Sequence, residues 1–118
     1  MTDRTLTVTR QTHPSGATVV SVAGELDHHT SPQFSRVLDD TPFGPEAPVV
    51  IDLAELTFCD STGITVLVTA YRRAHATSAR LFFTGTSSHL MRVFHTVGLD
   101  KIFTFEPTTE HALKALPS

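Results

Sequence analysis

A continuous β-branched run, Val49-Val50-Ile51, followed by an amphipathic helical pattern is the feature that most constrains the fold. A short strand that is apolar at every position is typical of a central strand covered on both faces. After it, apolar residues recur at helical spacing on Ile64, Leu67, Val68 and Tyr71. This stripe predicts a helix that begins near Ser61. A buried strand that leads into such a helix predicts an α/β fold.

Further strand and helix patterns lie on both sides of this unit. Alternation from Thr5 to Thr9 and a valine-rich stretch from Ala17 to Ala23 predict an opening hairpin. The other expected elements are a helix capped by Thr30 or Ser31, a strand over 80–84, a helix with Leu90, Met91, Phe94 and Val97 that ends at Gly98, a strand over 102–105 and a terminal helix from Pro107. The order ββαβαβαβα predicts a single domain over residues 1–118, with a core at about 5–116, in which a mixed five-stranded sheet packs with four helices.

Composition and charge narrow the classes of function. A net charge of −3 gives no basic stripe for a phosphate backbone, so we expect no direct contact with nucleic acid. The single cysteine, Cys59, allows neither an intramolecular disulfide nor a thiolate zinc site. Adjacent His28 and His29 would point apart on a helix or a strand, so we expect no metal site, and no cofactor is indicated.

The apolar stretches are all too short to cross a bilayer, and the first ten residues lack the layout of a secretory signal. We therefore expect a cytoplasmic protein that acts without a membrane. Because no long apolar segment is evident, we also expect it to be monomeric when free.

The motif Asp60-Ser61-Thr62-Gly63 lies at the predicted junction between strand and helix. The first backbone N–H groups of a helix lack internal partners, so Asp60 or Ser61 is suited to capping and Gly63 to a tight entry. The same positive end of the helix would also stabilise a phosphate on Ser61, which would change the surface and leave the fold intact. From the residues alone, both interpretations remain open.

A third interpretation makes Ser61 the nucleophile of an esterase-like enzyme. A nucleophile elbow has glycines two residues before and after the serine, and Cys59 occupies the first of these positions. The spacing therefore argues against hydrolysis. The residues available as base and orienting acid would be His28, His29, Asp27 and Asp60.

The stretch from Val49 to Ile64 closely resembles the signature of STAS domains, specifically of bacterial anti-sigma factor antagonists. The stretches 24–30 and 93–103 also resemble that subgroup, and the resemblance extends from about Thr5 to Leu116. Departures from the pattern are Cys59, Thr65 and the segment before residue 80, and none of them is the serine itself.

The resemblance implies that Ser61 is phosphorylated by a cognate anti-sigma factor that is itself an ATP-dependent serine kinase. Unphosphorylated protein would bind this kinase and free its sigma factor, phosphorylated protein would not, and a serine phosphatase would reset the switch. The chain itself would not be an enzyme. The alternative is a STAS interaction or scaffold module, in a signalling or transporter-associated complex, that is never phosphorylated. The residues implied at the kinase interface are Asp27, His28, Asp60, Thr62 and Gly63.

Overall fold

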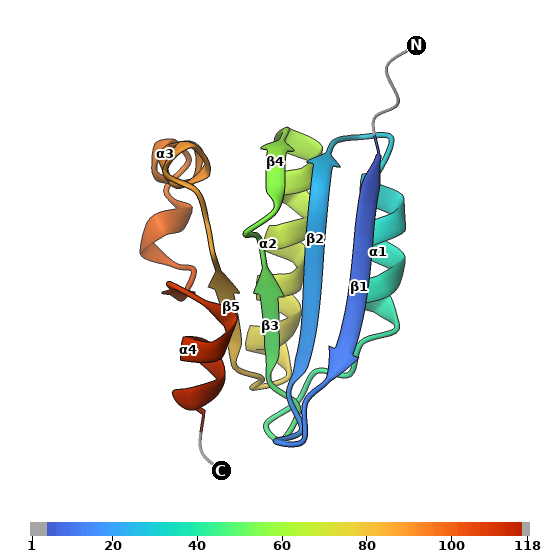
Figure 1. Ribbon diagram of the computed structural model, residues 1–118, viewed down its shortest axis with the longest axis vertical. Coiled ribbons are helices and arrows are strands. Elements are labelled where there is room, and N and C mark those ends of the chain that lie inside the picture. The colour runs from blue at the N-terminus through green and yellow to red at the C-terminus, as the bar shows by residue number, and fades with distance from the viewer. Residues whose placement is uncertain (1–4, 117–118) are drawn as a thin grey trace.

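The computed structural model describes residues 5–116, which form a mixed sheet with helices packed on both of its faces (Figure 1). The elements in chain order are β1 (Leu6–Thr12), β2 (Thr18–Leu26), α1 (Ser31–Asp39), β3 (Val49–Asp52), β4 (Leu56–Cys59), α2 (Ser61–Ala76), β5 (Leu81–Thr84), α3 (Ser88–Thr96), the 3₁₀ helix η1 (Leu99–Lys101), β6 (Phe105–Glu106) and α4 (Thr109–Lys114). None of the helices within 5–116 is long and apolar enough to cross a membrane.

The sheet contains six strands, one more than the sequence predicts. Its main order is β1-β2-β3-β5-β6, with β1 antiparallel to β2 and the remaining pairs parallel. The additional strand, β4, pairs in parallel with the last three residues of β2, with a register shift between Gly24 and Glu25. It has only four residues, of which Thr57 and Phe58 are exposed. The predicted α/β class, the mixed sheet and the four helices are confirmed.

The core lies on both faces of β3, as its uninterrupted apolar run predicts. Val49 and Ile51 belong to the large cluster that includes side chains of α1, α2 and α3. Val50, between them, packs in a smaller cluster with Ala112 and Leu116 at the C-terminal end of the chain. Successive residues of a strand face opposite sides of a sheet, which explains this division.

The prediction of a strand over 102–105 is wrong except at Phe105, where β6 begins. Gly98 ends the α3 segment with a left-handed φ of 82°, as expected, but the chain then forms η1. The Phe103 N–H donates to the Leu99 carbonyl at 2.9 Å, so it is used within this turn. Val97 was expected on the buried side of α3. It follows the last residue of the helix and is 54% exposed.

Candidate functional site

The carboxyl ends of β2 and β4 place the two predicted site segments side by side. The strands are parallel, Leu26 pairs with Cys59, and the Asp60 N–H donates to the Leu26 carbonyl at 3.1 Å. The turn that begins at Asp27 and the start of α2 therefore leave the sheet together. In open α/β sheets, this carboxyl edge is where ligands usually bind.

Asp60, and not Ser61, caps α2. Asp60 has an extended backbone conformation, and its carboxylate Oδ1 accepts a hydrogen bond from the Gly63 N–H at 2.9 Å. Ser61 is the first residue of the helix and is exposed, and its hydroxyl makes no hydrogen bond to any residue within 5–116. Capping of α2 therefore belongs to the Asp60 side chain and not to Ser61.

Asp27 is buried and organises the turn between β2 and α1. Its Oδ1 accepts hydrogen bonds from the N–H groups of His29, at 2.9 Å, and Thr30, at 3.1 Å. The hydroxyl of Thr30 accepts from the Asp27 N–H at 2.9 Å and donates to the Glu25 carbonyl at 2.8 Å. Of the two predicted caps, Thr30 or Ser31, Thr30 occupies the N-cap position of α1, but its hydroxyl makes no capping hydrogen bond because it is used to fix the turn.

The two histidines after Asp27 do not point apart. Both lie in the turn, not in a helix or strand, and their ring centroids are 4.0 Å apart with an interplanar angle of 37°. The expectation that the two rings point apart, which assumed a helix or a strand, is thus wrong for this pair. Both residues are exposed, so this edge of the sheet presents two imidazoles near the start of α2. In the part of the chain that the structure describes, no three histidine, cysteine or acidic residues cluster as metal ligands would.

Thr62 and Gly63, both predicted to contact a partner, have different surroundings. Thr62 is exposed, whereas Gly63 is buried. A Cβ at Gly63 would lie 2.7 Å from Leu26 Cγ and 2.9 Å from Cys59 Sγ, so glycine allows α2 to approach the ends of β2 and β4. Gly63 thus holds the helix start close to the sheet.

The Cys59 thiol lies beneath the site and is buried. The pKa of this thiol is raised to about 12, mainly by burial and to a smaller extent by the neighbouring Asp60 carboxylate. The thiolate is the nucleophilic form, so Cys59 is unsuited to chemistry at neutral pH. Sequence reasoning missed Phe58 as a candidate surface residue, although it is 39% exposed only three residues before Ser61.

The fold and this site together define a small α/β domain that presents a serine at the start of a helix on the carboxyl edge of its sheet. A model described as the STAS domain matches residues 8–112, and the chain belongs to this family.

Several known proteins are similar to the chain. The anti-sigma-B factor antagonist of Listeria monocytogenes serovar 1/2a is 34% identical over 83 residues, which cover 70% of this chain and 73% of that relative. The crystal structure of an anti-sigma factor antagonist from Mycobacterium paratuberculosis has 30% sequence identity and a TM-score of 0.82, and the match covers 97% of this chain and 96% of that one. The Bacillus cell fate determinant SpoIIAA in its phosphorylated form shares the fold, with a TM-score of 0.71 and 23% identity over 92% of this chain and 97% of that one.

Proposed function

We propose that this protein is an anti-sigma factor antagonist, and that phosphorylation of Ser61 switches it off. The names of the similar proteins from Listeria and Mycobacterium support the antagonist role. The observation that carries the proposed switch is that the helix cap and the exposed hydroxyl at the start of α2 belong to different residues. Asp60 makes the capping hydrogen bond, and the exposed Ser61 hydroxyl makes no hydrogen bond within 5–116.

A phosphate on Ser61 is compatible with the fold for two reasons. The serine hydroxyl points into solvent, so the added group displaces no packed side chain. The start of a helix carries positive partial charge, and the Asp60 cap satisfies only one of the first N–H groups of α2. A phosphate would add about −1.5 to −2 charges to this surface, which alters docking while leaving the sheet unchanged.

The proposed partner is an anti-sigma factor that is an ATP-dependent serine kinase. In its unphosphorylated form the antagonist binds this kinase and releases the sigma factor, and a serine phosphatase restores that form. We place the exchange in the cytoplasm and treat the antagonist as a regulator, not as an enzyme. The free protein is proposed to be a monomer.

The five proposed interface residues contribute in two ways. His28 and Thr62 are exposed and would contact the kinase directly, and Asp60 is half-buried beside them. Asp27 and Gly63 are buried, so their contribution would be indirect. Asp27 would fix the turn that carries His28, and Gly63 would fix the position of the helix start.

The decisive experiment is the intact mass of the protein after incubation with the cognate kinase and ATP. We expect a single phosphate on the parent and on Thr69→Ala, which removes an exposed hydroxyl of α2 outside the proposed interface, and none on Ser61→Ala. A phosphate that persists in Ser61→Ala would contradict the assignment of Ser61.

Binding of the two serine variants separates the proposal from its alternatives. Ser61→Ala should bind the kinase and Ser61→Asp should not, whereas equal binding would favour a constitutive scaffold module. The esterase interpretation requires a base for the serine, and no histidine within 5–116 hydrogen-bonds to Ser61. If the protein hydrolysed an activated ester and Ser61→Ala did not, the esterase interpretation would be supported.

A further inference from the structure

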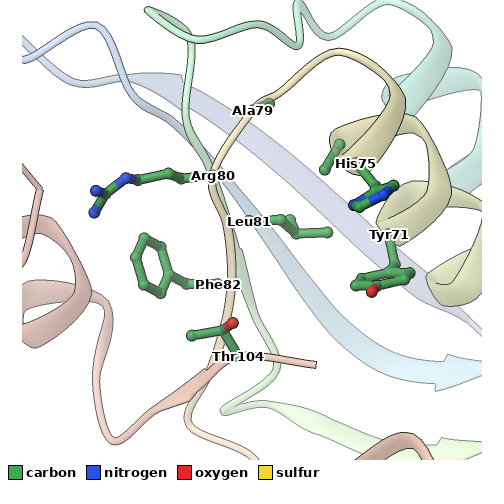
Figure 2. A pocket seen from close by; sticks show the side chains of 8 residues that line it. Tyr71, His75, Ala79, Arg80, Leu81, Phe82 and Thr104 are labelled. Carbon is green, nitrogen blue, oxygen red and sulfur yellow. The ribbon is translucent and has the colours of Figure 1, made fainter. Parts of the chain in front are cut away.

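A groove of about 320 Å³ lies between the C-terminal part of α2 and the start of β5, far from Ser61 along the helix. Figure 2 shows how its side chains divide about the β5 backbone. Leu81 points toward Tyr71 and His75 of α2, whereas Arg80 and Phe82 lie on the opposite side of the strand. The groove therefore follows the edge of the strand and is not a pit in one face of the sheet.

The backbone edge of β5 that faces away from β3 is unpaired at Leu81, beside this groove. One edge of the strand bonds to β3, as the Val49 N–H donates to the Arg80 carbonyl at 2.9 Å. On the other edge, the Phe83 N–H donates to the Thr104 carbonyl at 2.9 Å, but β6 contains only two residues. Two residues before Phe83, Leu81 also directs its backbone N–H and carbonyl away from β3. Within 5–116 these two groups have no backbone partner on that edge. An unpaired strand edge of this kind is a template for another extended chain.

The side chains around the edge define what such a chain would carry. On the Leu81 side the wall is apolar and aromatic, with Ala74 and the stacked rings of Tyr71 and His75, whose centroids are 6.3 Å apart. On the other side Arg80 is exposed, and within 5–116 it has no carboxylate partner. A chain laid along the edge would direct alternate side chains to these two walls.

We propose that this edge of β5 binds an extended peptide segment of a partner protein in which an acidic residue stands next to an apolar one. The peptide backbone would pair with the N–H and carbonyl of Leu81, as an added strand of the sheet. Its apolar side chain would pack against Tyr71, and its carboxylate would face the Arg80 guanidinium. The same positive charge would repel a basic segment, which gives the site its selectivity.

This peptide site is independent of the proposed phosphorylation. From Ser61 to His75 the helix advances by about 21 Å, at about 1.5 Å per residue. Screening at physiological salt acts over about 8 Å, so a charge at Ser61 has little effect at the groove. The peptide should therefore bind Ser61→Asp as it binds the parent, and loss of either site would leave the other intact.

The test uses the full chain, labelled with ¹⁵N, and a blocked peptide of alternating valine and glutamate, six residues long. We expect the amide signals of Leu81 and its neighbours to shift and that of Ser61 to stay in place. Arg80→Gln should weaken binding about three- to fivefold, as expected for an exposed ion pair, and the matched control Arg92→Gln, on α3 outside the groove, should not. A peptide with lysine in place of glutamate should bind more weakly.

Backbone pairing is tested without changing the protein. Two further probes carry N-methyl groups on alternate amides, in the two possible registers, and at least one of them should lose binding. Binding of both methylated probes as tight as that of the unmethylated peptide, equal binding of the lysine peptide, or no binding of the glutamate peptide at millimolar concentration would overturn the proposal. If free glutarate bound with the same dependence on Arg80 as the peptide, the groove would be a small-carboxylate site and the peptide proposal would be wrong.

Discussion

Replacing Asp60 by alanine separates capping from modification at the start of α2. The Asp60 carboxylate accepts the Gly63 N–H at 2.9 Å, so Asp60→Ala removes the cap of a 16-residue helix. Loss of an N-cap typically costs about 1 kcal/mol of the free energy of unfolding. The unfolding entropy, about 2.1 cal/mol/K per residue, amounts to about 250 cal/mol/K for a chain of 118 residues. The melting temperature should therefore fall by about 4 °C.

The assay is thermal and urea unfolding of the variant beside two controls. Asp60→Asn keeps a side-chain oxygen that can accept the same hydrogen bond, so it should stay close to the parent. Ser61→Ala removes an exposed hydroxyl and should change the free energy of unfolding by less than about 0.5 kcal/mol. The reasoning is refuted if Ser61→Ala destabilises the protein as much as Asp60→Ala, because Ser61 would then be a structural cap.

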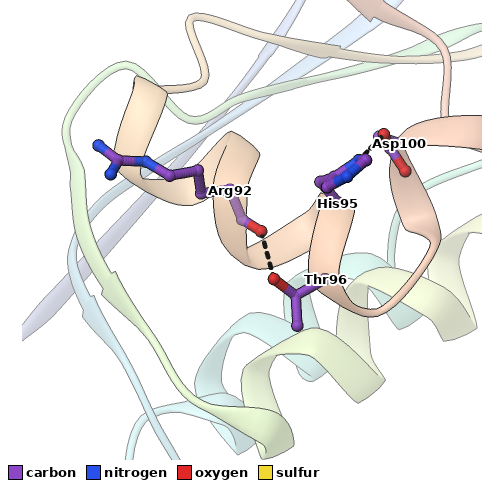
Figure 3. A network of polar contacts seen from close by, with 4 residues as sticks. All are labelled: Arg92, His95, Thr96 and Asp100. Carbon is purple, nitrogen blue, oxygen red and sulfur yellow. Dashed lines mark hydrogen bonds and ion pairs between the residues drawn. The ribbon is translucent and has the colours of Figure 1, made fainter.

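Three further predictions concern stability and reactivity. Ser61→Asp should be as stable as the parent or more stable by about 0.3–1 kcal/mol at low salt, since a negative charge at a helix start is favourable; a melting temperature several degrees lower would disprove this. Cys59 should resist an aromatic disulfide reagent at about pH 8 until the protein is unfolded in urea, because burial raises its pKa to about 12; rapid reaction of the native protein would be inconsistent with that burial. His95 Nδ1 lies 2.6 Å from Asp100 Oδ2 (Figure 3), and this contact raises the pKa of His95 above 6.5 and lowers that of Asp100 below 3.8. The stability that the protonated His95 contributes is complete below the pKa of His95 in the unfolded chain, and it is lost as pH rises through the pKa of His95 in the folded protein. The stability that the ionised Asp100 contributes is lost as pH falls through the pKa of Asp100 in the folded protein. His95→Gln should therefore destabilise the protein more at about pH 5.5 than at about pH 9, and equal effects at both values would rule out the ion pair.

The parts of the fold that sequence reasoning predicted are those whose pattern is local. The apolar run at 49–51 predicts a buried strand and the apolar stripe that begins at Ile64 predicts a helix packed on the core, and the structure confirms both. By contrast, β4 is a strand only because the last three residues of β2 lie beside it. It has only four residues, and their burial does not alternate because Thr57 and Phe58 are both exposed. The same holds for η1, which depends on Phe103 turning into the core to stack on Phe83 with ring centroids 4.2 Å apart.

The site residues named from the sequence stay predictions, whereas the structure shows which of them caps α2. Sequence alone indicated that Asp60 or Ser61 caps α2, and the choice required the extended backbone of Asp60 and its hydrogen bond. The contact between the two histidine rings arises from the turn that Asp27 holds, which periodicity does not describe. The groove at β5 was not predicted, because it depends on how far β6 extends.

The central claim is that phosphorylation of Ser61 controls binding to the anti-sigma factor. The most direct measurement is the dissociation constant of the purified kinase for the protein before and after phosphorylation, by calorimetry without ATP. We predict at least about a tenfold weaker complex after phosphorylation, equivalent to about 1.4 kcal/mol. Equal affinity of the two forms, with one phosphate confirmed on Ser61, would contradict the claim.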